Sequence, residues 1–290
     1  MIKEYFYQLS TFTLLATSIV SCEIINPDEE IPSYIHIDTI NVIITDPVQG
    51  SASHKISDAW VYLDENLIGA FELPVTLPIL ASGKHNIKIR AGIKLNGITA
   101  SRVFYPFYDF YSQEIDLKLT KIDTLKPAVN YFSSAIFAWK EDFEDSGFKI
   151  EKLSGSDTAI TLINDPSLVF EGNSCGAIFL DENKKIFKGS SLSSTPLNLP
   201  KGGFPVFLEM NYKNNQRFHV GIIAVHPSYK SEVVVLTLNP SENWNKIYIN
   251  LTNDVSNNVG ATGYYLFLYA EKESSVSYPA IYLDNLKIIH

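Results

Sequence analysis

The sequence contains few cysteines and no long basic run. Only two cysteines, Cys22 and Cys175, occur among its 290 residues, which is too few for a disulfide framework or a zinc site. Lysine and arginine total 23 against 32 acidic residues, so the formal net charge is −9. Nucleic-acid binding needs a positive surface that neutralises phosphates. The composition therefore argues against a nucleic-acid-binding protein and against a disulfide-stapled one.

Motifs that mark common catalytic sites are also missing. No HExxH, CxxC or Gly-x-Ser-x-Gly motif occurs, and no glycine-rich phosphate loop leads from a strand into a helix. The acidic pairs at 141–142 and 144–145 are neighbours in the sequence, whereas glycosidase carboxylates face each other across a cleft from separate elements. We therefore predict that the protein is not an enzyme, with an unrecognised hydrolase as the lesser alternative.

The residues that are abundant favour β-structure. Hydrophobic residues make up 46% of the chain, and it contains 17 phenylalanines and 16 tyrosines. Aromatic and β-branched residues are enriched in strands, and this apolar content is enough to build substantial cores. We expect an all-β protein, and its 290 residues leave room for one large domain or two ordinary ones.

The N-terminal leader ends at a cysteine. No residue from Tyr5 to Ser21 is charged, and its most apolar part, 12–20, is too short to span a bilayer securely. The residues at 19–22, IVSC, resemble a bacterial lipobox. The resemblance implies cleavage before Cys22 and attachment of lipid to its thiol. An ordinary secretory signal and an uncleaved membrane anchor remain the alternatives.

Lipid on Cys22 would attach the protein to a membrane, because each buried acyl methylene contributes about 0.8 kcal/mol. Cys175 would then stay unpaired as a small buried side chain. The acids at 28–30 resemble the export signals of Bacteroidetes surface lipoproteins, with a plain solvated linker as the alternative. We expect residues 1–21 to be a signal peptide and 22–32 an acidic tether. The predicted location is the outer membrane, facing the cell surface or, alternatively, the periplasm.

Residues 33–124 carry the pattern of a small antiparallel sandwich. Apolar residues alternate along 113–120, where Ile115, Leu117 and Leu119 would face a core, and again around 87 and 89. Two strand-like runs, at 59–63 and 67–71, flank a turn at 64–66.

This region resembles the PEGA-like, or carboxypeptidase-regulatory-like, modules of bacterial envelope proteins. The matching residues are AWVYLD at 59–64, then Gly69, Pro74, Leu80 and GKHNI at 83–87, although the spacing from Gly69 to Pro74 is longer than usual. Such modules have an Ig-like sandwich fold and mediate contacts. A charged segment with Pro127 follows, and we expect residues 125–134 to be a linker.

The second domain, residues 135–290, is expected to be a jelly-roll β-sandwich. Strand-like runs separated by turn residues occur at 207–212, 218–224, 233–238, 246–251, 264–269 and 281–289. Three stretches, EDFED at 141–145, FEGNS at 170–174 and YLDNLKI at 282–288, resemble galactose-binding-like jelly rolls, which include many carbohydrate-binding modules. The resemblance implies a fold more strongly than a ligand.

In that family an opening Glu and a closing Asp often hold a structural Ca²⁺. The matching residues here are Glu144 and Asp284. Calcium prefers six to eight oxygen ligands, and adjacent terminal strands would bring these carboxylates together. The alternative is that both are ordinary surface or turn residues. No other cofactor is expected.

Two groups of aromatic residues are candidates for contacts with a ligand or partner. Tyr229 and Tyr278 lie in Pro- and Ser-rich loops, where exposed rings could stack on a sugar. The run at 105–111, YPFYDFY, has five aromatics in seven residues. The candidates in this run are Tyr105, Phe107, Tyr108 and Tyr111. They would form either an exposed protein-contact patch or a loop folded back over the sandwich.

Two functions follow from these features. The first is a lipid-anchored interaction or accessory subunit that contacts other envelope proteins. The alternative is a surface lipoprotein that binds a glycan through the second domain.

Overall fold

The computed structural model describes residues 30–191 and 195–290. Cys22, Asp28 and Glu29 lie outside the described residues, so lipidation of Cys22 and the role of the acidic tether stay predictions. Glu30, the first described residue, is exposed. Within the described ranges, no helix combines the length and the apolar character needed to cross a bilayer.

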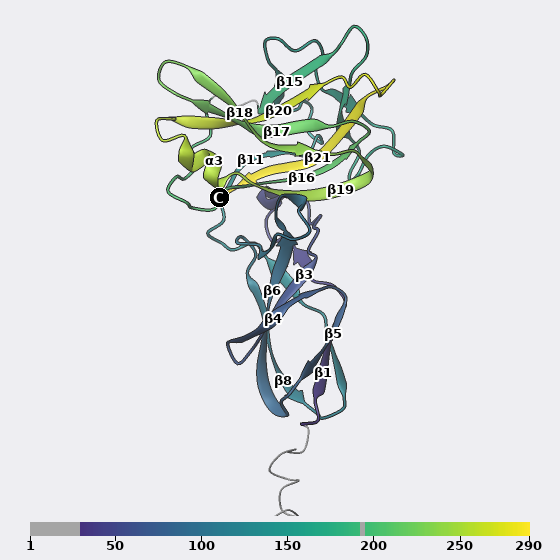
Figure 1. Ribbon diagram of the computed structural model, residues 1–290, viewed down its shortest axis with the longest axis vertical. Coiled ribbons are helices and arrows are strands. Elements are labelled where there is room, and N and C mark those ends of the chain that lie inside the picture. Colours follow the sequence, from purple (N-terminus) through teal and green to yellow (C-terminus); the bar gives the residue numbers. More distant parts are fainter. Residues whose placement is uncertain (1–29, 192–194) are drawn as a thin grey trace, which may run out of the picture.

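The chain folds into two β-domains that follow one another along the long axis (Figure 1). The first contains β1 (Ser33–Ile37), β2 (Asn41–Ile43), η1 (Pro47–Gln49), β3 (Asp58–Leu63), β4 (Asn66–Glu72), β5 (Val75–Ile79), β6 (Gly83–Lys94), η2 (Leu95–Gly97), β7 (Arg102–Phe104), β8 (Phe110–Leu117), β9 (Ile122–Leu125) and β10 (Ala128–Asn130). The second contains β11 (Phe137–Glu141), β12 (Ile150–Lys152), β13 (Thr161–Ile163), β14 (Cys175–Phe179), β15 (Ile186–Ser191), β16 (Phe207–Asn214), β17 (Phe218–Val225), β18 (Lys230–Leu238), β19 (Ser241–Asn250), α3 (Thr252–Asn257), β20 (Gly263–Glu271) and β21 (Ala280–Ile289). The predicted all-β architecture of two sandwiches is confirmed.

The first domain is a small sandwich. One layer has the strand order β4-β3-β6-β7, with β8 also paired to β6, and the other consists of β5-β1-β9 and β10-β2. Ile87 and Ile89 are fully buried in the core, as their alternation predicts. Leu119 is 47% exposed, which corrects its predicted inward position, because β8 ends at Leu117.

The predicted hairpin between β3 and β4 is present. The two strands pair antiparallel, and Leu63 faces Asn66 across the turn. Asp64 and Glu65 have φ angles of 47° and 66°, which is the left-handed geometry of a tight two-residue hairpin turn. A short acidic turn between two strand-like runs was therefore a reliable signal.

The segment at 125–134, expected to be a linker, belongs to the first domain. Strand β9 pairs parallel with β1 and ends at Leu125, and β10 pairs parallel with β2. Tyr131, which follows β10, is 4% exposed. These strands could not be recognised in the sequence, because the segment has mixed charges and each strand is only three or four residues long.

The second domain is a jelly-roll β-sandwich of two sheets. The first sheet has the order β13-β14-β21-β16-β19, with β11 also paired to β21, and we call it the proximal sheet. The second has the order β12-β15-β20-β17-β18, and we call it the distal sheet. In Figure 1 the proximal sheet lies toward the first domain and the distal sheet away from it. The core between them contains Leu208 and Leu283 from the proximal sheet and Ile222 and Leu266 from the distal sheet.

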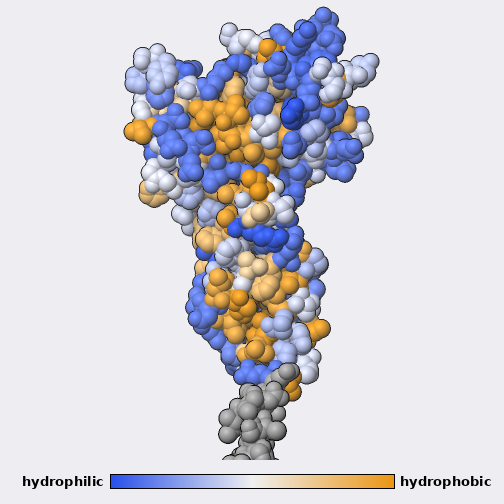
Figure 2. Space-filling view, viewed as in Figure 1, coloured by the Kyte–Doolittle hydropathy of each residue, from blue (hydrophilic) through white to orange (hydrophobic). Residues whose placement is uncertain are grey.

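Part of the outer face of the proximal sheet is docked on the first domain. Phe207, Tyr248 and Ile289 belong to the hydrophobic core of the first domain, not to that of their own sandwich. The ring of Tyr105 lies 5.4 Å from that of Phe207 and 4.8 Å from that of Tyr248. Tyr105 and Tyr108 are each 1% exposed. The space-filling view shows hydrophobic patches on both domains among hydrophilic side chains (Figure 2).

This docking corrects the expectation of an exposed aromatic patch in the run at 105–111. Tyr105, Phe107 and Tyr108 are buried, because the second domain covers them. Tyr111 is half-buried on β8, where its hydroxyl donates to Gln113. The run at 105–111 therefore contacts another domain of the same chain.

A buried charged cluster lies at the centre of the docked surface. The Glu209 carboxylate accepts hydrogen bonds of 2.8 Å from the hydroxyls of Tyr105 and Tyr131. It also lies 3.1 Å from the ammonium of Lys246 and 3.7 Å from that of Lys287. Burial alone would raise the pKa of Glu209, but the two lysines and the two tyrosines outweigh burial and lower it. Glu209 is therefore an anion enclosed by both domains.

Candidate functional site

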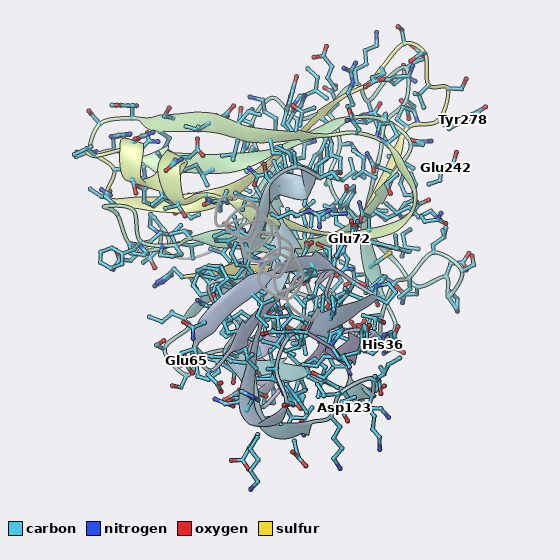
Figure 3. The ribbon with its side chains drawn as sticks, turned by 60° about the horizontal axis from the view of Figure 1, so that its bottom comes forward. His36, Glu65, Glu72, Asp123, Glu242 and Tyr278 are labelled. Carbon is cyan, nitrogen blue, oxygen red and sulfur yellow. The ribbon has the colours of Figure 1, made fainter. Side chains whose placement is uncertain are left out.

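A shallow groove of about 710 Å³ lies on the open part of the second domain. It is formed by the ends of β14 and β16, the start of β19 and the loop that leads into β21. Its lining comprises Leu168, Phe179, Leu180, Asp181, Lys213, Asn214, Asn215, Ser241, Glu242, Tyr278, Pro279, Ala280 and Tyr282. Figure 3 shows Tyr278 and Glu242 together at one end of this domain, apart from the labelled residues of the first domain. We call this feature the aromatic groove.

Three rings line the aromatic groove. Tyr278 is 85% exposed and Phe179 is 40% exposed, and Tyr282 is half-buried. Phe179 and Tyr282 pack edge to face, with ring centroids 6.1 Å apart. Among the described residues, no ring packs against Tyr278. An apolar ring surface is therefore open to solvent on this domain.

The backbone that carries Tyr278 is held in place although its ring is free. The side-chain amide of Asn215 donates to the Tyr278 carbonyl at 2.8 Å, and its oxygen accepts from the amide of Ala280 at 2.8 Å. The amide of Leu180 donates to the Pro279 carbonyl at 3.1 Å. The sequence places Asn215 in the turn after β16, so this turn positions the loop before β21.

Polar side chains lie around the rings. Lys213 supplies an ammonium donor, and Glu242 supplies an exposed carboxylate acceptor. Burial raises the pKa of Tyr282 above its ordinary value, with smaller contributions from Cys175 and Asp165, so its hydroxyl stays protonated at neutral pH. Rings beside convergent donors and acceptors can hold a molecule that has both apolar faces and hydroxyl groups.

A second pair of rings adjoins the aromatic groove. The rings of Phe170 and Trp244 lie 5.5 Å apart, and the indole nitrogen of Trp244 donates to the carbonyl of Leu168 at 3.2 Å. Leu168 itself lines the groove. Trp244 is half-buried and does not belong to the hydrophobic core of the second domain.

Tyr229, the other loop tyrosine singled out from the sequence, lies elsewhere. It is 59% exposed, and its ring is stacked on that of His226, with centroids 4.3 Å apart and planes 9° apart. It is not among the residues that line the aromatic groove. Of the two loop tyrosines, Tyr278 therefore lines the aromatic groove and Tyr229 does not.

The outer face of the distal sheet carries aromatic residues that are already covered. Tyr265, Phe267 and Tyr269 alternate along β20, and Phe267 is 2% exposed. The ammonium of Lys230 lies 5.2 Å from the Tyr265 ring, and the imidazole of His219 is stacked on Tyr269 at 5.4 Å. These rings have partners from the chain itself, whereas that of Tyr278 is free.

The predicted calcium ligands lie near one another on the outer side of the proximal sheet. Strands β11 and β21 pair, as predicted for the terminal strands. Burial raises the pKa of Asp284 to about 7, with Glu171 and Glu144 adding to the shift. Glu144 accepts hydrogen bonds from the amides of Asn173 and Ser174, at 2.8 and 2.9 Å.

Both Asp284 oxygens also accept backbone amides, from Asn285 at 2.7 Å and from Glu171 at 3.3 Å. Within the described ranges, no group of three His, Cys, Asp or Glu side chains is placed to hold a metal. N–H donors already occupy part of the acceptor capacity of these oxygens, so a calcium ion would have to displace or share them. The assignment of Glu144 and Asp284 as calcium ligands stays a prediction to be measured.

Cys175 is fully buried beneath the loop that precedes β14. Burial raises the pKa of its thiol to about 12, and Asp284 adds to the shift. A thiol that stays protonated is a poor nucleophile. Cys175 therefore acts as a small core residue.

The chain has been compared with known proteins. No protein-family model matches the sequence, and no curated protein matches it. Solved structures that match include the C-terminal family 22 carbohydrate-binding module of Clostridium thermocellum Xyn10B, which is 14% identical over 52% of this chain and 92% of its own, with a TM-score of 0.37.

Two others are the family 30 carbohydrate-binding module of a Clostridium thermocellum cellulosomal cellulase and a family 29 module solved with mannohexaose. The family 30 module is 11% identical and covers 55% of this chain and 94% of its own, with a TM-score of 0.33. The family 29 module is 16% identical and covers 54% of this chain and 91% of its own, with a TM-score of 0.33.

Proposed function

We propose that the second domain binds a glycan in the aromatic groove. The observation that carries this proposal is the free ring of Tyr278, 85% exposed, on a loop whose backbone is fixed by Asn215. Pyranose rings have an apolar C–H face that stacks on aromatic rings and a rim of hydroxyls that hydrogen-bond to polar side chains. The aromatic groove offers both kinds of surface.

The size of the aromatic groove suits a short stretch of a sugar chain. Its volume of about 710 Å³ falls within the range of about 300–1,000 Å³ that is usual for small-ligand sites. The Phe170–Trp244 pair extends the aromatic surface beyond Leu168. A polymer that crosses the groove would therefore meet more than one ring.

The proposal includes the lipid anchor and the location expected from the sequence. Cys22 would carry the lipid, and the chain would be displayed from the outer membrane toward the cell surface. The interpretation as an accessory subunit of an envelope assembly stays a prediction, but three of the aromatic residues offered as partner contacts are not available. Tyr105, Phe107 and Tyr108 are buried against the second domain, so they cannot also bind an external partner.

The test is affinity electrophoresis of the two-domain protein through gels that contain neutral polysaccharides, one polysaccharide per gel. We expect at least one polysaccharide to retard the wild-type protein, and Tyr278→Ala to lose about fivefold in affinity, because a ring stacking contact contributes on the order of 1 kcal/mol.

Tyr229→Ala is the matched control. Tyr229 is also an exposed loop tyrosine, 59% exposed, but it stacks on His226 outside the aromatic groove. We expect this variant to bind as the wild type does. Retardation by none of a broad panel of polysaccharides, or equal loss in both variants, would contradict the proposed site.

A further inference from the structure

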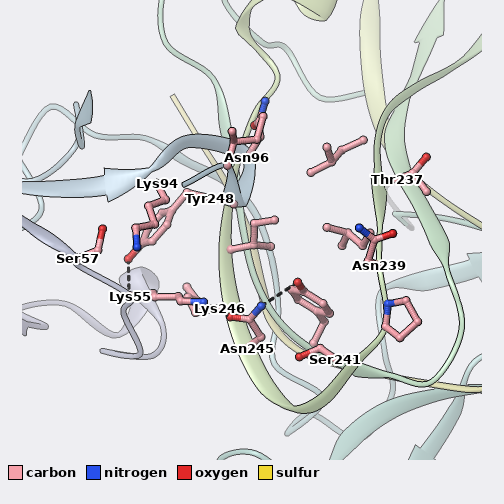
Figure 4. Close-up of a pocket in the computed structure, with 17 residues that line it drawn as sticks. Lys55, Ser57, Lys94, Asn96, Thr237, Asn239, Ser241, Asn245, Lys246 and Tyr248 are labelled. Carbon is pink, nitrogen blue, oxygen red and sulfur yellow. Dashed lines mark hydrogen bonds between the residues drawn. The ribbon is translucent and has the colours of Figure 1, made fainter. Parts of the chain in front are cut away.

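A second pocket lies at the seam between the two domains (Figure 4). Its volume is about 380 Å³, which suits a monosaccharide or disaccharide unit. The first domain contributes Lys55, Ser57 and the turn from β6 through η2, and the second contributes the end of β18, the following turn and β19. Because both domains line it, the pocket exists only when they are docked. We call it the seam pocket.

Hydrogen bonds between the domains fix the walls of the seam pocket. The backbone amide of Asn250 donates to the side-chain oxygen of Asn96 at 2.8 Å. The backbone amide of Lys55 donates to the hydroxyl of Tyr248 at 3.1 Å. A ligand would therefore bind a preformed site, and little conformational entropy would be lost in ordering the site.

The charged residues that line the seam pocket are all lysines. Lys55, Lys94 and Lys246 line it, and none of its lining residues, all of which the structure describes, is acidic. Figure 4 shows these lysines on one side, opposite Thr237 and Asn239.

Two of the three lysines have carboxylate partners outside the pocket. Lys94 pairs with Glu72 at 3.0 Å and Lys246 with Glu209 at 3.1 Å. No carboxylate of the described chain forms an ion pair with Lys55, whose ammonium donates instead to the neutral side-chain oxygen of Asn245. Burial and the nearby Lys94 both lower the pKa of Lys55. The charge of Lys55 therefore lacks a counter-charge, which an anionic ligand would supply.

The rest of the lining suits a sugar better than an inorganic anion. Asn96, Asn239, Ser57 and Thr237 present amide and hydroxyl groups, which can donate to and accept from sugar hydroxyls. Ser241 lines both the seam pocket and the aromatic groove, so the two sites adjoin. One sugar chain could reach both.

We propose that the seam pocket binds a carboxylate-bearing sugar, a uronic acid, with its carboxylate on Lys55 and its hydroxyls on the surrounding amides and hydroxyls. The site goes beyond the aromatic groove, and its key side chains are different. It also requires both domains, which gives their docking a role in binding.

The test is isothermal titration calorimetry of the two-domain chain with digalacturonic acid and, in parallel, with neutral lactose. We expect digalacturonic acid to bind and lactose to bind at least about tenfold more weakly, because a charge-assisted hydrogen bond contributes more than a neutral one. Lys55→Gln should weaken digalacturonic acid binding by about tenfold or more. Added sodium chloride should weaken it as well.

Lys230→Gln is the matched control, because Lys230 is an exposed lysine that lies over Tyr265 on the distal sheet. It should bind digalacturonic acid as the wild type does, and so should Tyr278→Ala, which separates this site from the aromatic groove. Lys55 is exposed, and an unchanged melting temperature of Lys55→Gln confirms its folding. Equal binding of lactose or of inorganic phosphate, insensitivity to salt, or full affinity in Lys55→Gln would each overturn the proposal.

Discussion

One end of the proximal sheet is buried against the first domain, and its other end is open to solvent. Three of its strands, β16, β19 and β21, run from the docked surface to the aromatic groove. At one end they present Phe207, Tyr248 and Ile289 to the first domain. At the other end they present Lys213, Glu242 and Tyr282 to solvent in the aromatic groove. The same sheet therefore serves as a domain interface and as a candidate binding surface.

A bulge in β21 separates the two ends. Asn285 has a φ of 49°, and the pairing of β16 with β21 shifts between Glu209 and Asn211. Inward residues fall at Ile281 and Leu283 before the bulge and at Leu286 after it, so the alternation moves by one residue. A bulge of this kind bends a strand and re-aims its side chains. Side chains on the outer face of one sheet can thus be buried at the end that the first domain covers and exposed at the other end.

The largest expected effect is at the docked end. Glu209→Ala leaves Lys246 and Lys287 buried without their anion, and we expect it to lower the free energy of unfolding by about 3–5 kcal/mol. The measurement is chemical denaturation. Glu232→Ala is the control, because it breaks an ion pair with Lys188 in which Glu232 is 44% exposed, and a surface pair contributes about 1 kcal/mol or less. Similar losses in the two variants would show that the cluster does not hold the domains.

The next effect lies between the two ends, at Asp284, and depends on pH. Its folded pKa of about 7 exceeds the ordinary 3.8, so folding favours the protonated acid. That stability is fully present below about pH 4 and is lost as the pH rises through about 7, with a total of at most about 4 kcal/mol. Asp284→Asn should therefore be more stable than the wild type above about pH 7. Its free energy of unfolding should also depend less on pH. Melting temperatures across this range are the measurement, and parallel curves for the two proteins would refute the raised pKa.

A smaller effect is expected at Tyr105, which docks beside Glu209. Tyr105→Phe removes a hydrogen bond of 2.8 Å to that carboxylate and keeps the ring packing. A hydrogen bond to a charged group contributes about 1.5–3 kcal/mol, so chemical denaturation should show a loss of this size. A loss below about 0.5 kcal/mol would mean that the hydroxyl does not stabilise the buried anion.

Tyr278→Ala, at the open end, should change the free energy of unfolding by less than about 0.5 kcal/mol, since the ring is 85% exposed. We expect this variant to lose ligand affinity without losing stability, and Tyr105→Phe to lose stability without losing ligand affinity. Thermal melting alongside the binding assay checks both. A marked drop in melting temperature for Tyr278→Ala would show that the ring supports the fold.

The smallest effect concerns calcium. N–H groups occupy the oxygens of Glu144 and Asp284, so we expect the melting temperature to be the same in calcium and in EDTA. A fall in EDTA that is absent from Asp284→Asn would instead establish the calcium site predicted from the sequence.

Much of the second domain could be predicted from its alternation. Each of the six strand-like runs from 207 to 289 corresponds to a strand, because apolar residues two apart face one core. The apolar spacing across 281–288 even contains the one-residue shift of the bulge. The short β9 and β10 could not be predicted, because segments of three or four residues carry too little periodicity.

The candidate sites were less predictable, since alternation gives the face of a residue but not what covers that face. Glu209 occupies an outward position on β16, which from the sequence is indistinguishable from a solvated one, yet it is fully buried. Phe179 and Tyr282 are outward aromatics that the sequence could have flagged beside Tyr278, had the pairing of β14 with β21 been known. No pattern in the sequence indicated a role for Lys55, because the seam pocket forms only when the two domains are docked.

The run of β16, β19 and β21 from one end of the sheet to the other has a mechanical consequence. The described chain begins at the end of the first domain that lies away from the second (Figure 1). If the chain is anchored through Cys22, as proposed, tension from a bound glycan would have to pass through both domains. Part of it would cross the docked surface, where Tyr105 and Tyr131 of the first domain donate hydrogen bonds to the buried Glu209 of β16.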